Sequence, residues 1–309
     1  MMPLLRPKLH DGWLSVAIAP DRMDFAHIRR REGKKPEVLL LNSYQRGGDD
    51  VEALSRLRKV LKLARYRCTT VLRVGEYQVL QVEPPDMPAA ELKEALPWRI
   101  KDMLNYPVES ATVDVLEIPG DPSAVGRAKQ VFAVAANNAI IAPRMALFDA
   151  AKVPLLAIDI PELAQRNISA LFEEEDRGLA MLCCDDAGAM LTFTFRGELY
   201  AARFTEVPLA QLQQAEELRR EQLYERIALE VQRSLDNFDR LNGHIRLPHL
   251  LVSPPPGVPG FLDYLRDNLS IPVMEMDLAK VLDFPAIPEL SQPTRQTQCL
   301  KVLGAALRE

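Results

Sequence analysis

Residues 250–269, LLVSPPPGVPGFLDYLRDNL, have the pattern of a strand, a tight loop and a helix, because an apolar run precedes leucines at helical spacing. In such a unit the loop amides and the helix N-terminus can hold a phosphate anion. Here the loop contains Pro254, Pro255 and Pro256, and proline has no amide hydrogen to donate. The unit is therefore a nucleotide site, a site that has been lost, or an ordinary connection.

The other polar residues of the chain fit no common enzyme template. None of the four histidines stands at metal-ligand spacing with another suitable donor. Ser253 lacks the context of a nucleophile elbow, and the acidic run 173–176 is typical of a solvated loop or helix end. Cys183 and Cys184 lie in the apolar run LAMLCC. That run predicts a buried strand, so we expect structural thiols in a reducing compartment.

Composition limits the class of protein. A chain of 309 residues, 48% hydrophobic and 26% charged, is ordinary globular material with room for about two domains. Its net charge of -5 argues against a duplex nucleic-acid partner, which usually requires a basic domain. We interpret the basic runs at 29–35 and 56–67 as solvated faces. The sequence contains neither a run of about 18 apolar residues nor a signal-peptide pattern, so we expect no direct membrane insertion.

Hydrophobic periodicity predicts the elements that must position these residues. In the first half it predicts strands at 13–20, 23–31, 37–46, 69–75, 77–85, 111–120, 130–136 and 154–161, and helices at 49–66, 87–107, 142–153 and 161–173. In the second half it predicts strands at 177–188, 189–198, 199–207, 246–253 and 271–279, and helices at 210–242, 261–269 and 294–309. Each half contains a strand meander, a helix, a buried strand and another helix, which indicates a weak internal duplication.

Five phrases, taken in their order and spacing, carry a family resemblance. They are VEPPDMPAAELKEALPWRIKDMLNYPVESATVDV, AIDIPELAQRNI, RGELYAAR, EVQRSLDNFD and PGFLDYLRDNLSIPVMEMD. Together they resemble the PilM-like proteins of type IV pilus assembly, and most closely the MshI group of mannose-sensitive haemagglutinin pilus biogenesis. The phrases run from about residue 83 to the C-terminus, and none of them alone is a catalytic signature.

The resemblance implies an α/β, actin-like fold of two lobes with a small inserted α+β subdomain, as in PilM and the cell-division protein FtsA. On this basis we expect the first lobe at residues 1–70 and 131–176, with the helix 294–309 packing back on it. The inserted subdomain is expected at residues 71–130 and the second lobe at 177–293.

The resemblance also implies three nucleotide-binding segments, and the first is altered here. In the family an N-terminal hairpin supplies a carboxylate for magnesium, a glycine beside the phosphates and a lysine that neutralises them. Ala17, Ala19 and Asp24 stand at these positions. At ~4 Å and an effective dielectric constant of about 20, exchanging attraction for repulsion with one phosphate charge changes the energy by roughly 8 kcal/mol before screening. The hairpin therefore opposes phosphate binding. Asp21 and Asp24 as magnesium ligands are the less favoured alternative to ordinary carboxylates of a hairpin turn.

The other two segments are altered as well. CCDDAGAML lacks the aspartate and the threonines of the second segment, although a small shift would bring Asp185 or Asp186 into the magnesium role with Gly188 behind it. In the third, the prolines 254–256 replace a glycine pair; Gly257 remains, and turn geometry explains it. These changes predict a pseudo-ATPase with no catalytic residue, metal or cofactor, while weak binding of ATP and magnesium is left open.

The resemblance further implies a cytoplasmic scaffold or adaptor, recruited to the inner-membrane face by the PilN-like cytoplasmic tail of an inner-membrane assembly protein. Trp98, Tyr106 and Pro107 are the candidate groove, where a tail would bind as an added strand or extended peptide. The ordinary interpretation, which we prefer on the sequence alone, is that Trp98 packs in the core of its own subdomain. An active actin-like ATPase, an adaptor like the type II secretion protein GspL, and a homo-oligomer or ring are also left open.

Overall fold

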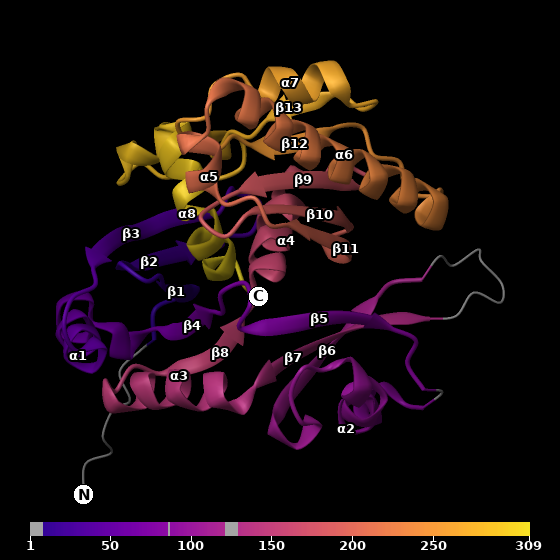
Figure 1. The fold of residues 1–309 in the computed structure, drawn as a ribbon. Coiled ribbons are helices and arrows are strands. Elements are labelled where there is room, and N and C mark those ends of the chain that lie inside the picture. Colours follow the sequence, from indigo (N-terminus) through magenta and orange to yellow (C-terminus); the bar gives the residue numbers. More distant parts are fainter. Residues whose placement is uncertain (1–8, 86, 121–128) are drawn as a thin grey trace, which may run out of the picture.

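The computed structural model describes residues 9–85, 87–120 and 129–309, which three β-sheets organise (Figure 1). In the first five-stranded sheet, β1 is antiparallel to β2 and parallel to β4. β2 pairs with β3 antiparallel, and β4 pairs with β8 parallel. The strands in spatial order are β3 (Glu37–Gln45), β2 (Arg22–Arg29), β1 (Trp13–Ile18), β4 (Arg67–Val71) and β8 (Leu155–Asp159).

The second five-stranded sheet repeats the order and the directions of the first. β9 is antiparallel to β10 and parallel to β12, while β10 pairs with β11 antiparallel and β12 with β13 parallel. This shared topology confirms the internal duplication predicted from the sequence. In spatial order the strands are β11 (Glu198–Thr205), β10 (Ala189–Phe195), β9 (Leu179–Cys184), β12 (Leu250–Ser253) and β13 (Val273–Glu275).

Helices and sheets alternate in layers (Figure 1). α1 and α3 cover the outer face of the first sheet, α4 and α8 lie between the two sheets, and α6 and α7 cover the outer face of the second. The helices of these layers, with the short α5, are α1 (Asp50–Leu61), α3 (Asn138–Ala150), α4 (Pro161–Phe172), α5 (Leu209–Gln214), α6 (Glu217–Asn242), α7 (Phe261–Asn268) and α8 (Pro293–Ala306). Short 3-10 helices are η1 (Leu63–Arg65), η2 (Lys101–Met103), η3 (Val108–Ser110), η4 (Leu278–Lys280) and η5 (Pro288–Ser291).

α1 begins and ends where its sequence dictates. The Asp49 side chain accepts a hydrogen bond from the Val51 amide at 2.8 Å and so caps the N-terminus. Leu54 and Leu57, three residues apart, bury one stripe of the helix against the first sheet. The helix stops at Lys62, whose φ of 55° is left-handed. The opposite side of α1 therefore faces outward.

α4 and α8 pack unusually closely in the central layer. A Cβ on Gly304 would lie 2.0 Å from the carbonyl oxygen of Ala164, so only glycine fits between the two backbones. The Asn167 side chain of α4 donates to the Gly304 carbonyl at 2.9 Å and fixes the contact. α8 also packs against β1, β2 and β4. The closing helix thus packs back on the first lobe, as the sequence predicted.

A small subdomain is built on the three-stranded sheet. Its strands in spatial order are β5 (Tyr77–Val82), β7 (Gln130–Asn137) and β6 (Ala111–Ile118). α2 (Ala89–Ile100) packs on one face, where Leu96 and Ile100 are fully buried. β7 pairs with both neighbours, so residues 131–137 belong to this sheet. The expected boundary between an insert at 71–130 and a first lobe resuming at 131 is therefore wrong by one strand.

Three further observations concern the chain as described. All four cysteines are buried and free in the described residues, as predicted. Burial raises the pKa of the Cys68 and Cys183 thiols to about 12, so they stay protonated. No helix within the described ranges is long and apolar enough to span a bilayer.

Candidate functional site

The hairpin of the first segment turns its polar groups onto itself. Ala17 and Asp24 are paired across β1 and β2, and the Ala19 amide closes the turn by donating to the Arg22 carbonyl. Asp24 is only 6% exposed, and it accepts a hydrogen bond from Arg22 Nε at 3.0 Å. Its second carboxylate oxygen has no partner among the described residues. The family's magnesium position is occupied by a methyl group, and the nearby carboxylate is held by an arginine.

In the second segment, the carboxylate of Asp185 binds the backbone amides of the same turn. Asp185 follows the last residue of β9, and its carboxylate accepts from the Ala187 amide at 2.9 Å and the Gly188 amide at 3.4 Å. Gly188 has a φ of +156°, and a Cβ there would lie 2.5 Å from the Thr205 carbonyl oxygen. In a phosphate-binding turn such amides would point at the ligand. Here a carboxylate takes that place.

Lys301 of α8 forms an ion pair with Asp185. Its side chain and that of Asp185 are both less than a third exposed, so the pair is partly shielded from solvent. The charge of Lys301 also acts on Glu162, lowering a pKa that burial raises. Sequence reasoning missed Lys301; the available signal was a single lysine in an apolar run of the closing helix.

Asp186 and Arg22 connect the two turns. Arg22 Nη2 lies 3.7 Å from Asp186 Oδ2, so the first hairpin reaches the second segment. The Asp186 side chain is 77% exposed, and an exposed ion pair of this kind contributes little to stability. The contact does show that the first and second segments lie side by side, as the resemblance implied. Within the described residues, no group of three His, Cys, Asp or Glu side chains is arranged to hold a metal ion.

The third segment is held by protein donors on its carbonyl groups. Thr297 of α8 donates to the Pro254 carbonyl at 3.0 Å and lies 2.8 Å from the Ser253 hydroxyl. Gln213 donates to the Pro256 carbonyl at 2.7 Å. The loop thus directs carbonyl oxygens to the protein, where a phosphate site would require amides. Pro255, between Pro254 and Pro256, has no amide hydrogen that could bind a phosphate.

Gly257 and the following turn complete the segment. Gly257 has a φ of +69°, and a Cβ there would meet only the flexible Gln213 side chain at 3.5 Å. Its left-handed backbone is a sufficient reason for glycine, as the sequence suggested. Val258 returns its amide to the Pro255 carbonyl at 3.4 Å, which closes the turn.

α8 is the element to which all three segments attach. Thr297 and Lys301, one helical turn apart, contact the third and second segments. Ala17 of the first segment packs against the apolar cluster that includes Cys299 and Leu300. The three segments named by the resemblance therefore converge on α8, which neutralises the second through Lys301, binds the third through Thr297 and contacts the first through apolar packing.

The candidate partner residues of the small subdomain have different environments. Trp98 is 64% exposed, so the preferred interpretation, that it packs in the core of its own subdomain, is wrong. Met103, a few residues further along, is 49% exposed. Tyr106 is half-buried, and its hydroxyl has no hydrogen-bond partner in the described part of the chain. Pro107 is exposed. The subdomain thus presents an exposed tryptophan and methionine at the end of α2.

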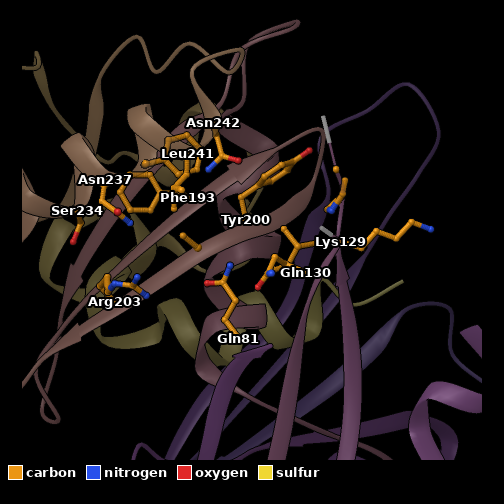
Figure 2. A pocket seen from close by; sticks show the side chains of 15 residues that line it. Gln81, Lys129, Gln130, Phe193, Tyr200, Arg203, Ser234, Asn237, Leu241 and Asn242 are labelled. Carbon is orange, nitrogen blue, oxygen red and sulfur yellow. The ribbon is translucent and has the colours of Figure 1, made fainter. Parts of the chain in front are cut away.

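A separate cavity of about 380 Å³ lies between the small sheet and the second lobe. Figure 2 shows Gln81 and Gln130 of the small sheet facing Tyr200 of β11 and Asn242 of α6. Phe193 and Phe238, stacked with ring centroids 4.5 Å apart, form part of the apolar wall. This cavity was not predicted, because its lining comes from separate elements and no short motif marks it.

Comparison with solved structures places this fold among known ones. The chain resembles a structure described as a PilM-PilN type IV pilus biogenesis complex, with a TM-score of 0.74, 17% identity, and coverage of 98% of this chain and 99% of that one. It also resembles a Bacteroides thetaiotaomicron protein with an actin-like ATPase fold and unknown function, with a TM-score of 0.50, 10% identity, and coverage of 96% and 98%. A third similar structure is the cytoplasmic domain of EpsL, an inner-membrane component of the Vibrio cholerae type II secretion system. Its TM-score is 0.48 at 13% identity, and the match covers 97% of this chain and 96% of that one.

The first two likenesses, together with the duplicated sheets, establish an actin-like fold, as the sequence predicted. No family model matches the chain, and no curated protein matches it.

Proposed function

We propose that this protein is a non-catalytic cytoplasmic adaptor of a type IV pilus assembly machine. It binds the cytoplasmic tail of a PilN-like inner-membrane protein and is recruited to the membrane face through it. The five sequence phrases favour the MshI group and its mannose-sensitive haemagglutinin pilus. The likeness to a structure described as a PilM-PilN type IV pilus biogenesis complex, over 98% of this chain, supports the coarser assignment to type IV pilus assembly.

The observation that carries the non-catalytic part of the proposal is the internal neutralisation of the second segment. To bind there, a nucleotide phosphate would displace the Asp185 carboxylate from the amides of Ala187 and Gly188 and would compete for Lys301. A displaced carboxylate would then lie beside the phosphate and repel it. Ala17 supplies no oxygen ligand to a magnesium ion that would offset this repulsion. The cleft is therefore a pseudo-ATPase site.

The binding part of the proposal is based on the exposed side chains of the small subdomain. Tryptophan is enriched among the residues that dominate binding energy at protein interfaces, because it buries a large rigid area. Trp98 and Met103 are both exposed near the end of α2, on a subdomain whose core is already filled by Leu96 and Ile100. An apolar segment of the partner's tail would cover them.

The test is co-purification of the full chain with the PilN-like protein, with and without its cytoplasmic tail. We expect association that requires the tail, and Trp98→Ala with Met103→Ala should weaken it at least about tenfold, the effect of removing one interface anchor. Leu218→Ala removes a comparably exposed apolar side chain from the second lobe and should leave binding unchanged. Tail-independent association, or none, would contradict the adaptor.

Mg-ATP provides the second arm of the test. A ligand at ~100-fold excess over its dissociation constant stabilises the folded state by about 2.7 kcal/mol, which raises the melting temperature by several degrees. We expect no shift at millimolar Mg-ATP. A clear shift would favour the alternative of an active actin-like ATP-binding protein, whatever the outcome of the tail experiment.

A further inference from the structure

One stretch of the first lobe is basic and contains no acidic residue. Between Ala53 and Gly75 the chain has seven arginines and lysines and neither aspartate nor glutamate, although the whole protein has a net charge of -5. The seven residues are Arg56, Arg58, Lys59, Lys62, Arg65, Arg67 and Arg73. This local excess of positive charge is opposite in sign to the net charge of the protein.

The structure places most of this charge on the outward side of α1 and η1. Leu54 and Leu57 face the first sheet, and Arg56 and Lys59 project from the opposite side, with Lys62 and Arg65 continuing past the end of the helix. Figure 1 shows α1 at the end of the first lobe that lies away from the second lobe. We call Arg56, Lys59, Lys62 and Arg65, together with Val60 between them, the basic face.

The charges of the basic face are not used by the fold. Within residues 9–85, 87–120 and 129–309, none of its four cations forms an ion pair. Arginines elsewhere are engaged: Arg46 binds Asp50, and Arg144 binds Glu76 at 3.1 Å. Two other cations of the stretch are also engaged, since Arg58 donates to the Lys152 carbonyl at 2.8 Å and Arg67 lies over the Trp13 ring.

Acidic residues near the basic face are few. Asp49, Asp50 and Glu52 stand at the start of α1, where Asp50 pairs with Arg46. Asp149 lies near the end of α3, and Asp11 follows His10, whose amide donates to the Arg65 carbonyl. Lys152, which is exposed, follows Asp149 by one turn and offsets it. The surface around α1 and η1 therefore keeps a clear positive excess.

α6 provides the contrast within the same molecule. It exposes Arg219, Arg226, Arg233 and Arg240 at seven-residue intervals. Exposed glutamates and aspartates alternate with them along the helix, as in an ordinary solvated face. Both surfaces thus carry four cations, but only on α1 and η1 are the cations not interspersed with acidic residues.

We propose that the basic face binds the anionic headgroups of phospholipids at a membrane surface. The outer side of a helix is convex, which suits a broad layer of headgroups better than an extended peptide, whose backbone requires a groove or a sheet edge. Lysine and arginine bind such a layer through charge alone. Val60, 66% exposed in the middle of the cations, would add an apolar contact at the headgroup level. This contact is peripheral and independent of the partner tail.

The test uses the purified full chain and lipid vesicles, without any pilus protein. We expect co-sedimentation with vesicles of phosphatidylcholine mixed with phosphatidylglycerol, and none with phosphatidylcholine alone. Binding should weaken with added salt, because counterions screen charges over about 8 Å at physiological ionic strength. Each basic residue at a membrane surface contributes about fivefold in affinity, so replacing Arg56, Lys59, Lys62 and Arg65 by Gln should reduce binding by at least about a hundredfold.

The matched control replaces Arg219, Arg226, Arg233 and Arg240 of α6 by Gln, which removes the same charge from another face. It should bind vesicles as the wild type does. Circular dichroism and thermal melting check that both variants fold; if the α1 variant does not, Lys59→Gln with Lys62→Gln should still lower affinity about twenty-fivefold. Absence of binding to anionic vesicles, equal binding to neutral ones, or equal loss in both variants would overturn the proposal. A basic face that binds an acidic protein but not anionic vesicles would also overturn it.

Discussion

At the scale of single residues, the second segment and α8 provide both signs of charge from their own side chains. The Asp185 carboxylate binds two turn amides, and Lys301 neutralises it from α8. A partly buried ion pair stabilises a protein only while both members are present, since removal of one leaves the other desolvated and unpaired. Lys301 should therefore matter to folding as well as to the proposed exclusion of nucleotides.

We predict that Lys301→Met lowers the free energy of unfolding by about 1–3 kcal/mol, the range for a buried polar group left without its partner. The methionine keeps the length of the side chain, so the loss reports the missing charge. Urea denaturation measures it. Lys59→Met, on an exposed lysine with no ion pair in the described residues, should stay within about 0.5 kcal/mol of the wild type. Equal effects of the two substitutions would contradict this role for Lys301.

The sequence predicted the altered nucleotide positions but not their replacement. Ala17, Ala19 and the prolines could be recognised because the family motif states what should stand there. Lys301 could not be paired with Asp185 in the same way, because the two residues lie on elements far apart in the chain. Trp98 was left between two interpretations, since helical periodicity does not tell an exposed tryptophan from a buried one at a subdomain edge.

At the scale of elements, the contact between α4 and α8 fixes the central layer. The position of Gly304 against the Ala164 carbonyl sets the distance between the helices. Asn167 then holds the Gly304 carbonyl from the side. Since α8 also carries Thr297 and Lys301, a displacement of this helix would move the groups that occupy the second and third segments.

Gly304→Ala should therefore destabilise the protein, although alanine favours a helix over glycine by about 1 kcal/mol. The new methyl group would overlap a backbone oxygen, and overpacking of this kind costs about 1–3 kcal/mol. We expect a lower melting temperature in calorimetry. Gly47→Ala is the control, because a Cβ there meets nothing within 4 Å. A Gly304→Ala variant at least as stable as the wild type would show that the helices separate without cost.

Element boundaries were the least predictable part of the fold. The helix expected at 142–153 begins earlier, at Asn138, because the Asn137 side chain caps the Ala139 amide at 2.8 Å. The helix expected at 210–242 is divided at Ala215, which is extended and whose carbonyl accepts from Arg220. Hydrophobic periodicity predicted the buried stripes of the helices. The ends and breaks of helices depend on single side-chain hydrogen bonds, which hydrophobic periodicity does not reveal.

At the scale of the whole molecule, two buried carboxyl groups lie where its parts meet. Glu162 of α4 accepts a hydrogen bond from Tyr77 of the small subdomain at 2.6 Å. Asp159, at the end of β8, pairs with Arg308 just beyond α8 at 3.2 Å. Burial raises the pKa of both carboxyl groups, while their partners act in the opposite direction. The stability of these two contacts should therefore depend on pH.

For an acid whose pKa is higher in the folded state, the folded protein binds the proton more tightly. The free energy of unfolding then falls as pH rises from the ordinary carboxyl range through the raised pKa, by about 1.4 kcal/mol for each tenfold difference in proton affinity between the folded and unfolded states. Glu162→Gln removes one such group and keeps an acceptor for the Tyr77 hydroxyl. Its stability, relative to the wild type, should therefore increase with pH, while Asp159 keeps part of the slope in both proteins.

Urea unfolding of the wild type and Glu162→Gln across a series from about pH 4 to about pH 7 measures this difference over the range in which carboxyl groups titrate. Glu221→Gln, on an exposed glutamate of α6, is the control and should give a curve parallel to that of the wild type. If Glu162→Gln is parallel as well, the carboxyl group does not hold its proton more tightly in the folded state. The contact between the small subdomain and α4 would then depend on the Tyr77 hydrogen bond and apolar packing without a titrating group.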